Sequence, residues 1–559
     1  MSDHPTDSRH PLGINRRTFL KQAGAAGVGS VLASRLSTPD SAYAQDSTVK
    51  ADPRARRGGT LRFGVNSSPA HFDVHQSNSV SNIGAQAPMY DLLIRRDPRD
   101  GQTIIPDLAT RWEISPDGKK YTFHLRRGVK FHDGADFTAE DVKATYQRIV
   151  SPPKGVVIPR TPLFSVVSDI VALDPYRIEF RLGDSRPQAL MLGAFACGFN
   201  IILRKKTLDD NGGNLRQVMA YPGTGPFRHV SRTDKEVWIQ ERNPNYWNKG
   251  LPYFDRLEIY HLLPFSPELG SALLAGKIDY GRLIDPVTWR KAKETRGMHA
   301  AEFNQSVIQA VCVNNKKPPL GDPRVRRAMH LALDRYALLD VVKDVAPMTI
   351  GGFVYPMHEL STPASGLANR LGYQRDTRAA VQEAKRLLAE AGHAGGIKNL
   401  TFVVRDMISY KLWGVAVQSM LKETLNIETN LRIVQASQVY EDAAAGNFDL
   451  LITSITSTLM DPSDFFGSWY GKDGPLNFSQ WTNPAFHDLA RQIEREVDQG
   501  KRKSMVRQAE GILESDPPLL PLCYEIIYDA WHDRVRGQNP STYFGIYDVD
   551  RWDNVWLAT

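Results

Sequence analysis

The segment from Pro106 to Val150 constrains the fold of this chain more than any other part. Residues 121–125 alternate between apolar and polar side chains, a pattern typical of a strand with one buried face. Residues 138–141, Thr-Ala-Glu-Asp, have the form of a capping box, and apolar residues recur at helical spacing after them. A strand followed by a capped amphipathic helix indicates a mixed α/β domain.

The length of the chain requires more than one domain. It has 559 residues, and its 42% hydrophobic and 23% charged residues are ordinary for a globular protein. A single hydrophobic core rarely extends beyond about 250–300 residues, so we expect two or three domains. No segment after the N-terminal region has the uninterrupted apolar run that a transmembrane helix needs.

The first 44 residues resemble a twin-arginine signal peptide. The sequence Asn15-Arg-Arg-Thr-Phe-Leu-Lys21 precedes an uncharged, glycine-rich run at 22–34, and Ala42-Tyr-Ala44 offers a small-residue cleavage site. An amphipathic basic tail is the alternative interpretation. We expect a flexible leader at 45–57 and no lipid anchor, because no Cys follows the cleavage site. The protein would then meet the twin-arginine export machinery and reside in the periplasm.

Charge and cysteine content argue against two classes of protein. The net charge is +7 for the whole chain, and the basic clusters are scattered without interleaved aromatics, so we predict no nucleic-acid partner. Cys197, Cys312 and Cys523 are too few and too far apart for a disulfide framework or a zinc site. We expect them to be buried, and leave open whether Cys312 pairs with Cys523.

The literal sequence of the first segment points to one family. The string W-x-x-S-x-D-G-x-x-Y-x-F-x-L-R-x-G-V-K-F-x-D-G-x-x-x-T-A-E-D-V resembles one found in solute-binding proteins of family 5, the extracytoplasmic peptide, nickel and opine receptors of ABC importers. Further motifs follow in the order typical of that family. They are Gly223–Phe227 with Glu241–Trp247, Leu273–Asp279, Gly321–Met329, and Asn447–Leu450 with Asp461–Phe466.

The resemblance implies an α/β, two-lobed periplasmic-binding-protein fold, a clamshell with an extra subdomain in lobe I. The boundaries we expect are a signal peptide at 1–44, a leader at 45–57, lobe I at 58–90, 215–305 and 523–559, the extra subdomain at 91–214, and lobe II at 306–522. Strands at 307–313 and 520–528 would cross between the lobes and act as the hinge.

Ligands of such folds bind between the lobes, so the contact residues come from loops of both. In lobe I, the loop after the first strand matches the first contact loop of the family and contains Ser67, Ser68, His71 and Phe72. In lobe II, the matching segments contain Arg405, Ser454, Ile455 and Thr458. Tyr410 and Trp413 follow Arg405 at helix-like spacing, and we expect them to line the cleft through one face. Core packing is the alternative for Tyr410 and Trp413.

Two of these positions carry the prediction about the ligand. Peptide-binding members have an Asp, which neutralises the ligand's α-ammonium, where this chain has Thr458. A hydroxyl does not offset a buried cation, so we expect ligands without a free α-ammonium unless another carboxylate, such as Asp73, replaces it. Arg405 matches the arginine that pairs with the ligand carboxylate in dipeptide-binding members, an internal pair with Asp406 being the alternative.

The resemblance therefore implies an acidic or neutral solute, such as an opine-like conjugate, a modified peptide or a sugar phosphate. We expect no metal, because His71 and His75 lie in a loop without a third ligand nearby. We interpret Asp461 as a structural Asp-Pro turn residue.

The predicted function is capture of a solute by lobe closure and delivery to an ABC permease and its ATPase subunits, without a cofactor. An exported enzyme is one alternative, but the chain lacks a G-x-S-x-G elbow, paired cysteines and a phosphate-binding loop, so we predict no catalytic residues. A chemoreceptor or chaperone subunit that serves no transport is the other, and the sequence does not separate it from a transport protein.

Overall fold

The computed structural model describes most of the chain after the predicted export signal. The described residues are 49–65, 68–355, 358–457, 459, 461–538 and 550–558, and all of them belong to one compact unit. The predicted twin-arginine motif and its cleavage site lie outside these residues. None of the described helices combines the length and the apolar character that a membrane span needs.

One mixed sheet runs through the described part of the chain. Its eleven described strands follow the order β15 (Ile427–Val434), β14 (Ile397–Arg405), β16 (Leu450–Thr456), β12 (Met298–Val313), β17 (Leu519–His532), β11 (Tyr280–Gly281), β1 (Thr60–Val65), β10 (Arg256–His261), β9 (Val237–Arg242) and β8 (Phe227–Thr233), with β13 (Met348–Thr349) paired to β17. The strands before β12 in this order belong to lobe II, and those after β17 belong to lobe I.

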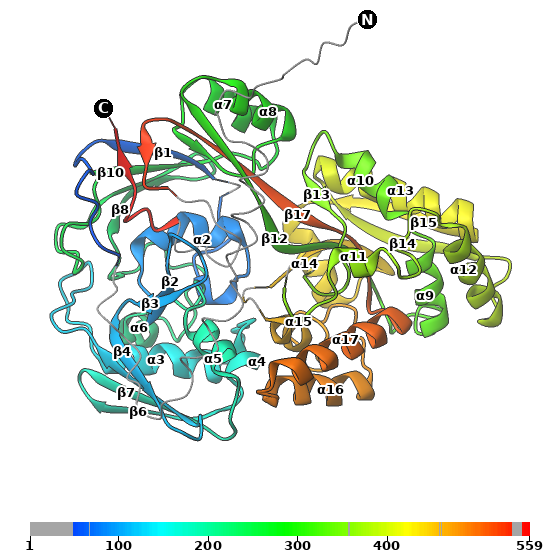
Figure 1. Ribbon diagram of the computed structural model, residues 1–559, viewed down its shortest axis with the longest axis horizontal. Helices are drawn as coiled ribbons and strands as arrows, with labels where there is room; N and C mark the ends of the chain where they lie inside the picture. Colours follow the sequence, from blue (N-terminus) through cyan, green and yellow to red (C-terminus); the bar gives the residue numbers. More distant parts are fainter. Residues whose placement is uncertain are drawn as a thin grey trace, which may run out of the picture. The chain divides into compact units, whose positions relative to one another are not determined.

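The two long strands β12 and β17 connect the lobes. They are antiparallel neighbours from the pair Met298–His532 to the pair Cys312–Leu519, and Figure 1 shows them side by side, in green and in orange to red. Their register shifts between Asn304 and Ile308, which marks a bulge in the ladder. The strand predictions for 307–313 and 520–528 are confirmed, whereas the domain boundaries remain predictions.

Lobe I carries the inserted subdomain. The subdomain contains a four-stranded antiparallel sheet in the order β4 (Ala109–Ile114), β5 (Lys120–Leu125), β7 (Arg177–Leu182) and β6 (Val167–Asp174). Its helices are α3 (Ala139–Val150), α4 (Thr161–Phe164), α5 (Gln188–Phe195) and α6 (Lys205–Asp210). The other elements on this side are α2 (Val80–Gln86), α7 (Pro267–Leu274), α8 (Pro286–Glu294), the 3-10 helices η1 (Val74–Gln76) and η2 (Ala87–Met89), and the short strands β2 (Ile94–Arg96), β3 (Ile104–Pro106), β18 (Val535–Arg536) and β19 (Trp556–Leu557).

The strand and the capped helix predicted from the sequence are β5 and α3. Thr138 Oγ1 accepts a hydrogen bond from the Glu140 amide at 3.3 Å, and the Asp141 carboxylate accepts one from the Thr138 amide at 3.0 Å. The capping box satisfies amide groups that the first turn of a helix leaves without partners.

Lobe II consists of the parallel strands β14, β15 and β16 with helices on both faces. Its helices are α9 (Pro323–Leu331), α10 (Arg335–Val342), α11 (Ala364–Leu367), α12 (Arg378–Glu390), α13 (Ile408–Leu425), α14 (Ala436–Ala445), α15 (Pro462–Ser468), α16 (Pro484–Arg495) and α17 (Gln499–Ser515). Alternate strand residues enter two separate hydrophobic cores: Phe402 and Val404 join one, and Val403 joins the other.

The C-terminal segment is tied into lobe I by buried charges. Arg551 is fully buried and forms ion pairs with Asp91 at 2.7 Å, with Asp107 at 2.8 Å and with Asp553 at 3.4 Å. A buried arginine is costly without such partners. The three carboxylates therefore hold the end of the chain against the start of the inserted subdomain.

The described part of the predicted leader packs on lobe I instead of standing apart from it. Val49 is buried in a small apolar cluster, and the Asp52 amide donates to the hydroxyl of Tyr253 at 2.5 Å. Arg57 Nη2 donates to the Gly250 carbonyl at 3.0 Å. Residues 49–57 look polar and aperiodic in the sequence, but one apolar side chain and a few backbone contacts are enough to dock them.

The three cysteines are buried, as expected from the sequence, and none of them forms a disulfide. Cys312 lies opposite Leu519 and Cys523 lies opposite Gln309, so the two hinge cysteines are not neighbours across the ladder. Burial raises the pKa of the Cys312 thiol to about 12, which suits an apolar core residue.

Candidate ligand-binding site

The carboxyl ends of the lobe II strands gather several polar side chains. Arg405 is the last residue of β14, and Ser454 lies near the end of the parallel strand β16. Helix α13 begins at Ile408, directly after β14. Ligands of open α/β sheets bind outside the carboxyl ends of the strands, so this edge is where a site is expected.

Five side chains form what we call the Arg405 cluster: Arg405, Tyr410, Ser454, Gln309 and Glu525. Ser454 and Gln309 are register partners on β16 and β12. Gln309 Nε2 donates to Glu525 Oε1 on β17 at 2.6 Å. The Arg405 guanidinium lies 5.8 Å from the centroid of the Tyr410 ring. The cluster therefore joins both hinge strands to the binding edge of lobe II.

Arg405 has no ion-pair partner among the described residues. The internal pair with Asp406 is not formed, because that carboxylate accepts from Lys411 Nζ at 2.9 Å and from Gln435 Nε2 at 3.0 Å. Arg405 is only partly buried. Its guanidinium is thus left with donors for a carboxylate or phosphate from outside the chain.

Electrostatic effects inside the Arg405 cluster reflect burial. Burial raises the pKa of Tyr410 to about 12, although the nearby Arg405 charge and the Ser454 side chain act in the opposite direction. Burial also raises the pKa of Glu525 to about 7, against the lowering effects of its Gln309 hydrogen bond and of Arg405. The tyrosine is therefore neutral, and the glutamate titrates close to neutral pH.

Lobe I reaches this region through a small apolar cluster. Phe265 and Leu283 of lobe I pack with Ala346 and Ile527, and Met407, two residues after Arg405, packs against them. The Arg405 cluster consequently lies close to where the two lobes meet, as a ligand site closed by both lobes requires.

Two predicted contact residues of lobe I, Ser68 and Phe72, lie beside Arg232 on β8, and a third, His71, contacts Asn82. The Ser68 hydroxyl accepts from Arg232 Nη2 at 2.6 Å, and the Phe72 ring lies 5.2 Å from the same guanidinium. His71 accepts a hydrogen bond from Asn82 at its carbonyl, at 2.8 Å, and burial lowers the pKa of its imidazole to about 4. No described contact joins these three residues to the Arg405 cluster.

Two predicted contact residues of lobe II are core residues. Trp413 is fully buried in the lobe II core and its indole N–H donates to the Leu338 carbonyl at 3.3 Å. Ile455 is also fully buried, opposite Ile308 on β12. Packing between strand and helix faces accounts for both side chains. Ser67 and Thr458 lie outside the described residues.

Asp73 is not free to replace the missing acid at position 458. It is fully buried and pairs with Arg148 Nη2 at 2.5 Å, and it also accepts from Gln76 and from the Leu215 amide. Asp461 is structural, as predicted: it caps α15 and holds both terminal nitrogens of Arg502, at 2.6 and 2.7 Å.

No group of three or more potential metal ligands occurs among the described residues. His75 is buried, and its Nε2 lies 2.9 Å from the Ile201 carbonyl. Burial lowers the pKa of its imidazole to about 3.

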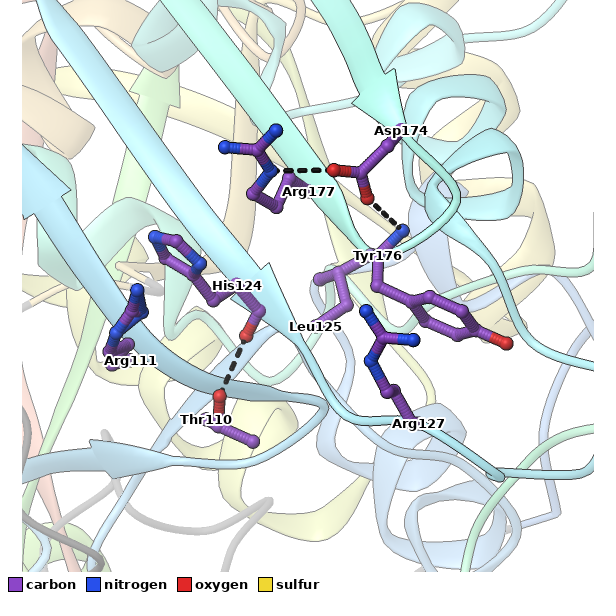
Figure 2. A pocket seen from close by; sticks show the side chains of 8 residues that line it. All are labelled: Thr110, Arg111, His124, Leu125, Arg127, Asp174, Tyr176 and Arg177. Carbon is purple, nitrogen blue, oxygen red and sulfur yellow. Dashed lines mark hydrogen bonds and ion pairs between the residues drawn. The ribbon is translucent and has the colours of Figure 1, made fainter.

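A hollow of about 430 Å³ lies elsewhere, on the sheet of the extra subdomain. Figure 2 shows its lining, in which Arg177 pairs with Asp174 at 2.6 Å. Arg127 lies over the ring of Tyr176, 4.6 Å from its centroid. Arg111, His124 and Arg177 of its lining each lie within 4 Å of a carboxylate, so the hollow is a weaker candidate than the Arg405 cluster.

Sequence reasoning missed Gln309 and Glu525. Gln309 interrupts the apolar run 307–313 of β12, and Glu525 is the one charged residue in the run 519–528 of β17. Those interruptions are the signal that could have identified them. Their contact depends on the register shift after Asn304, which no local pattern reveals.

Comparison with known proteins identifies the family of this chain. Residues 103–477 match the family described as bacterial extracellular solute-binding proteins, family 5 Middle. Di/tripeptide-binding protein 2 of Pseudomonas aeruginosa (strain UCBPP-PA14) is 27% identical over 530 residues, which covers 89% of this chain and 95% of that protein.

Two solved structures share the fold. The periplasmic binding protein DppA of Helicobacter pylori, in complex with the peptide STSA, has a TM-score of 0.79 at 24% identity, covering 90% of this chain and 99% of that chain. AgaA of A. tumefaciens R10, in complex with agropinic acid, has a TM-score of 0.79 at 22% identity, and the match covers 90% of this chain and 99% of that chain. These neighbours hold different ligands in one fold, so the fold alone does not select the ligand.

The family match covers more than half of the chain, and the fold is that of two-lobed periplasmic binding proteins. The protein therefore belongs to family 5 of the bacterial extracellular solute-binding proteins. It is a periplasmic protein and acts as the substrate-binding component of an ABC importer.

Proposed function

We propose that the protein binds a small peptide-like or acidic organic solute through a carboxylate held by Arg405, and delivers it to a membrane permease. The observation that carries this proposal is the position of Arg405, which lies at the carboxyl end of β14 without an ion-pair partner among the described residues. A guanidinium fork binds a carboxylate with two parallel hydrogen bonds. The relative from Pseudomonas aeruginosa, named as a di/tripeptide-binding protein, is consistent with a peptide-like ligand.

Lobe closure is the proposed mechanism. A solute held by the Arg405 cluster and by lobe I would stabilise a closed form that the permease recognises, with ATP hydrolysis by partner subunits driving transport. Export through the twin-arginine pathway is part of the proposal and rests on Asn15–Lys21. We propose a binding role and no catalytic one, because the matched family and the similar proteins are described as binding proteins.

Thermal-shift measurements test the proposal. A pancreatic digest of casein should raise the melting temperature of the purified protein, and methyl esterification of its carboxylates should abolish the effect, because a ligand that binds only the folded state stabilises it. Opine-like N-carboxyalkyl amino acids form a second probe set.

Arg405→Gln should lose most of the shift, whereas Arg375→Gln should keep it. Arg375 is a matched control, since its guanidinium also lies over a tyrosine ring, 4.1 Å from the centroid of Tyr336, away from the cluster. An equal response from the esterified digest, or a full response in Arg405→Gln, would refute the role of the arginine.

A further inference from the structure

Glu525 is a carboxylate placed in a hinge strand at the edge of the candidate site. It follows Cys523 at the strand period of two, so both side chains emerge on the same face of β17. Cys523 belongs to the lobe II core that also contains Tyr410. Glu525 therefore lies at the rim of that core, beside the Arg405 cluster.

The carboxylate has little compensation from the protein. Its side chain accepts one hydrogen bond, from Gln309 Nε2 at 2.6 Å, and no lysine, arginine or histidine of the described residues lies within 4 Å of it. Gln309 is itself fully buried and its Oε1 has no partner among the described residues. A partly enclosed carboxylate next to an unpaired polar atom is poorly solvated and accepts a cation readily.

We propose that Glu525 binds the cationic group of the solute, an ammonium in a peptide-like ligand, while Arg405 binds its carboxylate. The inference rests on the proposed function and narrows it to zwitterionic solutes. The negative charge that neutralises the ammonium would then come from Glu525 on β17. Thr458 carries no charge, and Asp73 is already paired with Arg148.

The expectation of an amine-free ligand, drawn from Thr458 alone, is thereby replaced. A Glu on the hinge strand and an Arg at the end of β14 would bind opposite ends of one molecule. Since β17 also continues into lobe I, a ligand on Glu525 would contact the strand that both lobes share.

The proposal predicts a pH dependence of binding. The groups that face Glu525 among the described residues are Arg405 on β14, Tyr410 on α13, and Cys523 on its own strand. Burial holds the pKa of Glu525 near 7, so the carboxyl is partly protonated at neutral pH before a cation arrives. Affinity for an ammonium-bearing solute should increase as the pH rises from about 5.5 to about 7, below the pKa of about 7.7–8 at which a peptide α-ammonium loses its own proton.

The test measures the thermal shift of wild type and of three variants. Each protein is mixed either with the untreated casein digest or with the same digest after N-acetylation. Glu525→Gln keeps an oxygen that can accept from Gln309 but removes the charge. Glu302→Gln is the matched control, because Glu302 is an exposed carboxylate on the neighbouring hinge strand β12. Arg405→Gln completes the set, and circular dichroism verifies that each variant is folded.

The expected result has three parts. Wild type and Glu302→Gln respond to the untreated digest, Glu525→Gln needs about 10- to 100-fold more digest for the same shift, and N-acetylation removes the advantage of wild type over Glu525→Gln. The response of Glu525→Gln should also lose its pH dependence.

An equal response of Glu525→Gln and wild type to the untreated digest would overturn the inference while leaving the role of Arg405 intact. A larger thermal shift of wild type with the N-acetylated digest than with the untreated digest would also overturn the inference. No response of wild type to either digest or to the opine-like acids would instead overturn the proposed function, and with it the inference, so the two failures are distinguishable.

Discussion

At the scale of single residues, the charges of the candidate site are compensated differently from those of two buried arginines elsewhere in the molecule. Arg551 has three carboxylates around it, and Arg502 is held by both oxygens of Asp461. Arg405 and Glu525 have no ion-pair partner among the described residues. Charges left without partners inside a protein are uncommon unless they serve binding.

The raised pKa of Glu525 has a consequence for stability without ligand. The folded state binds this proton more tightly than the unfolded state, so the contribution of Glu525 to stability falls as the pH rises from about 4.5 to about 7. Relative to wild type, Glu525→Gln should gain on the order of 1–3 kcal/mol between pH 5 and pH 8. Urea unfolding at several pH values measures this, and a difference independent of pH would contradict it.

The buried pair between Asp461 and Arg502 should be important for folding. Arg502→Ala leaves the Asp461 carboxylate buried beside the start of α15 and should cost about 3–5 kcal/mol in urea unfolding. Arg491→Ala is the control, because Arg491 and Asp488 form an exposed pair, and it should produce no measurable change. Equal effects of the two substitutions would show that the buried pair has no special role.

At the scale of elements, local patterns predicted much of what the structure contains. The strand β5, the capping box of α3 and the apolar hinge strands follow from side-chain alternation and cap chemistry. Contacts between distant segments did not follow. Gln309 and Glu525 meet only because β12 carries a bulge, and Trp413 is in the core because β14 and α13 pack against α10.

The glycine at position 225 has a steric reason. A Cβ on Gly225 would lie 2.4 Å from backbone atoms of Met89 and Tyr90, so even alanine forces the two segments apart. Gly225→Ala should destabilise the protein by about 1–3 kcal/mol. Gly511→Ala, in α17 with open space around the added carbon, should stabilise it by about 0.5–1 kcal/mol. Thermal unfolding distinguishes the two, and effects of the same sign would contradict the packing argument.

At the scale of the whole described unit, contacts beyond the hinge strands also join the subdomain of lobe I to lobe II. Asp184 pairs with Arg495 at 3.0 Å, Arg186 lies 3.7 Å from Glu494, and the Ser468 hydroxyl donates to the Pro159 carbonyl at 3.0 Å. These three contacts are polar, and both side chains of the Asp184–Arg495 pair are exposed. An exposed ion pair contributes only about 0–1 kcal/mol, which suits an interface that opens and closes.

Reversing one charge of this interface should weaken ligand binding without touching the site. Arg495→Glu places like charges against Asp184 and should reduce the affinity for the casein digest by up to about fivefold. The double variant with Asp184→Arg should restore it. Titration calorimetry measures both, and a double variant no better than the single one would mean that these side chains do not act as a pair.

The most direct test of the account is the distance between the lobes with and without solute. Spin labels on Val157→Cys in the subdomain and Val497→Cys in lobe II report it, since both positions are exposed and the native cysteines are buried. In the otherwise unaltered protein, adding the casein digest should shift the distances between the two spin labels to one shorter population. In Arg405→Gln the distances should stay unchanged. Unchanged distances in both proteins, or equal closure in both, would contradict solute capture by lobe closure around Arg405.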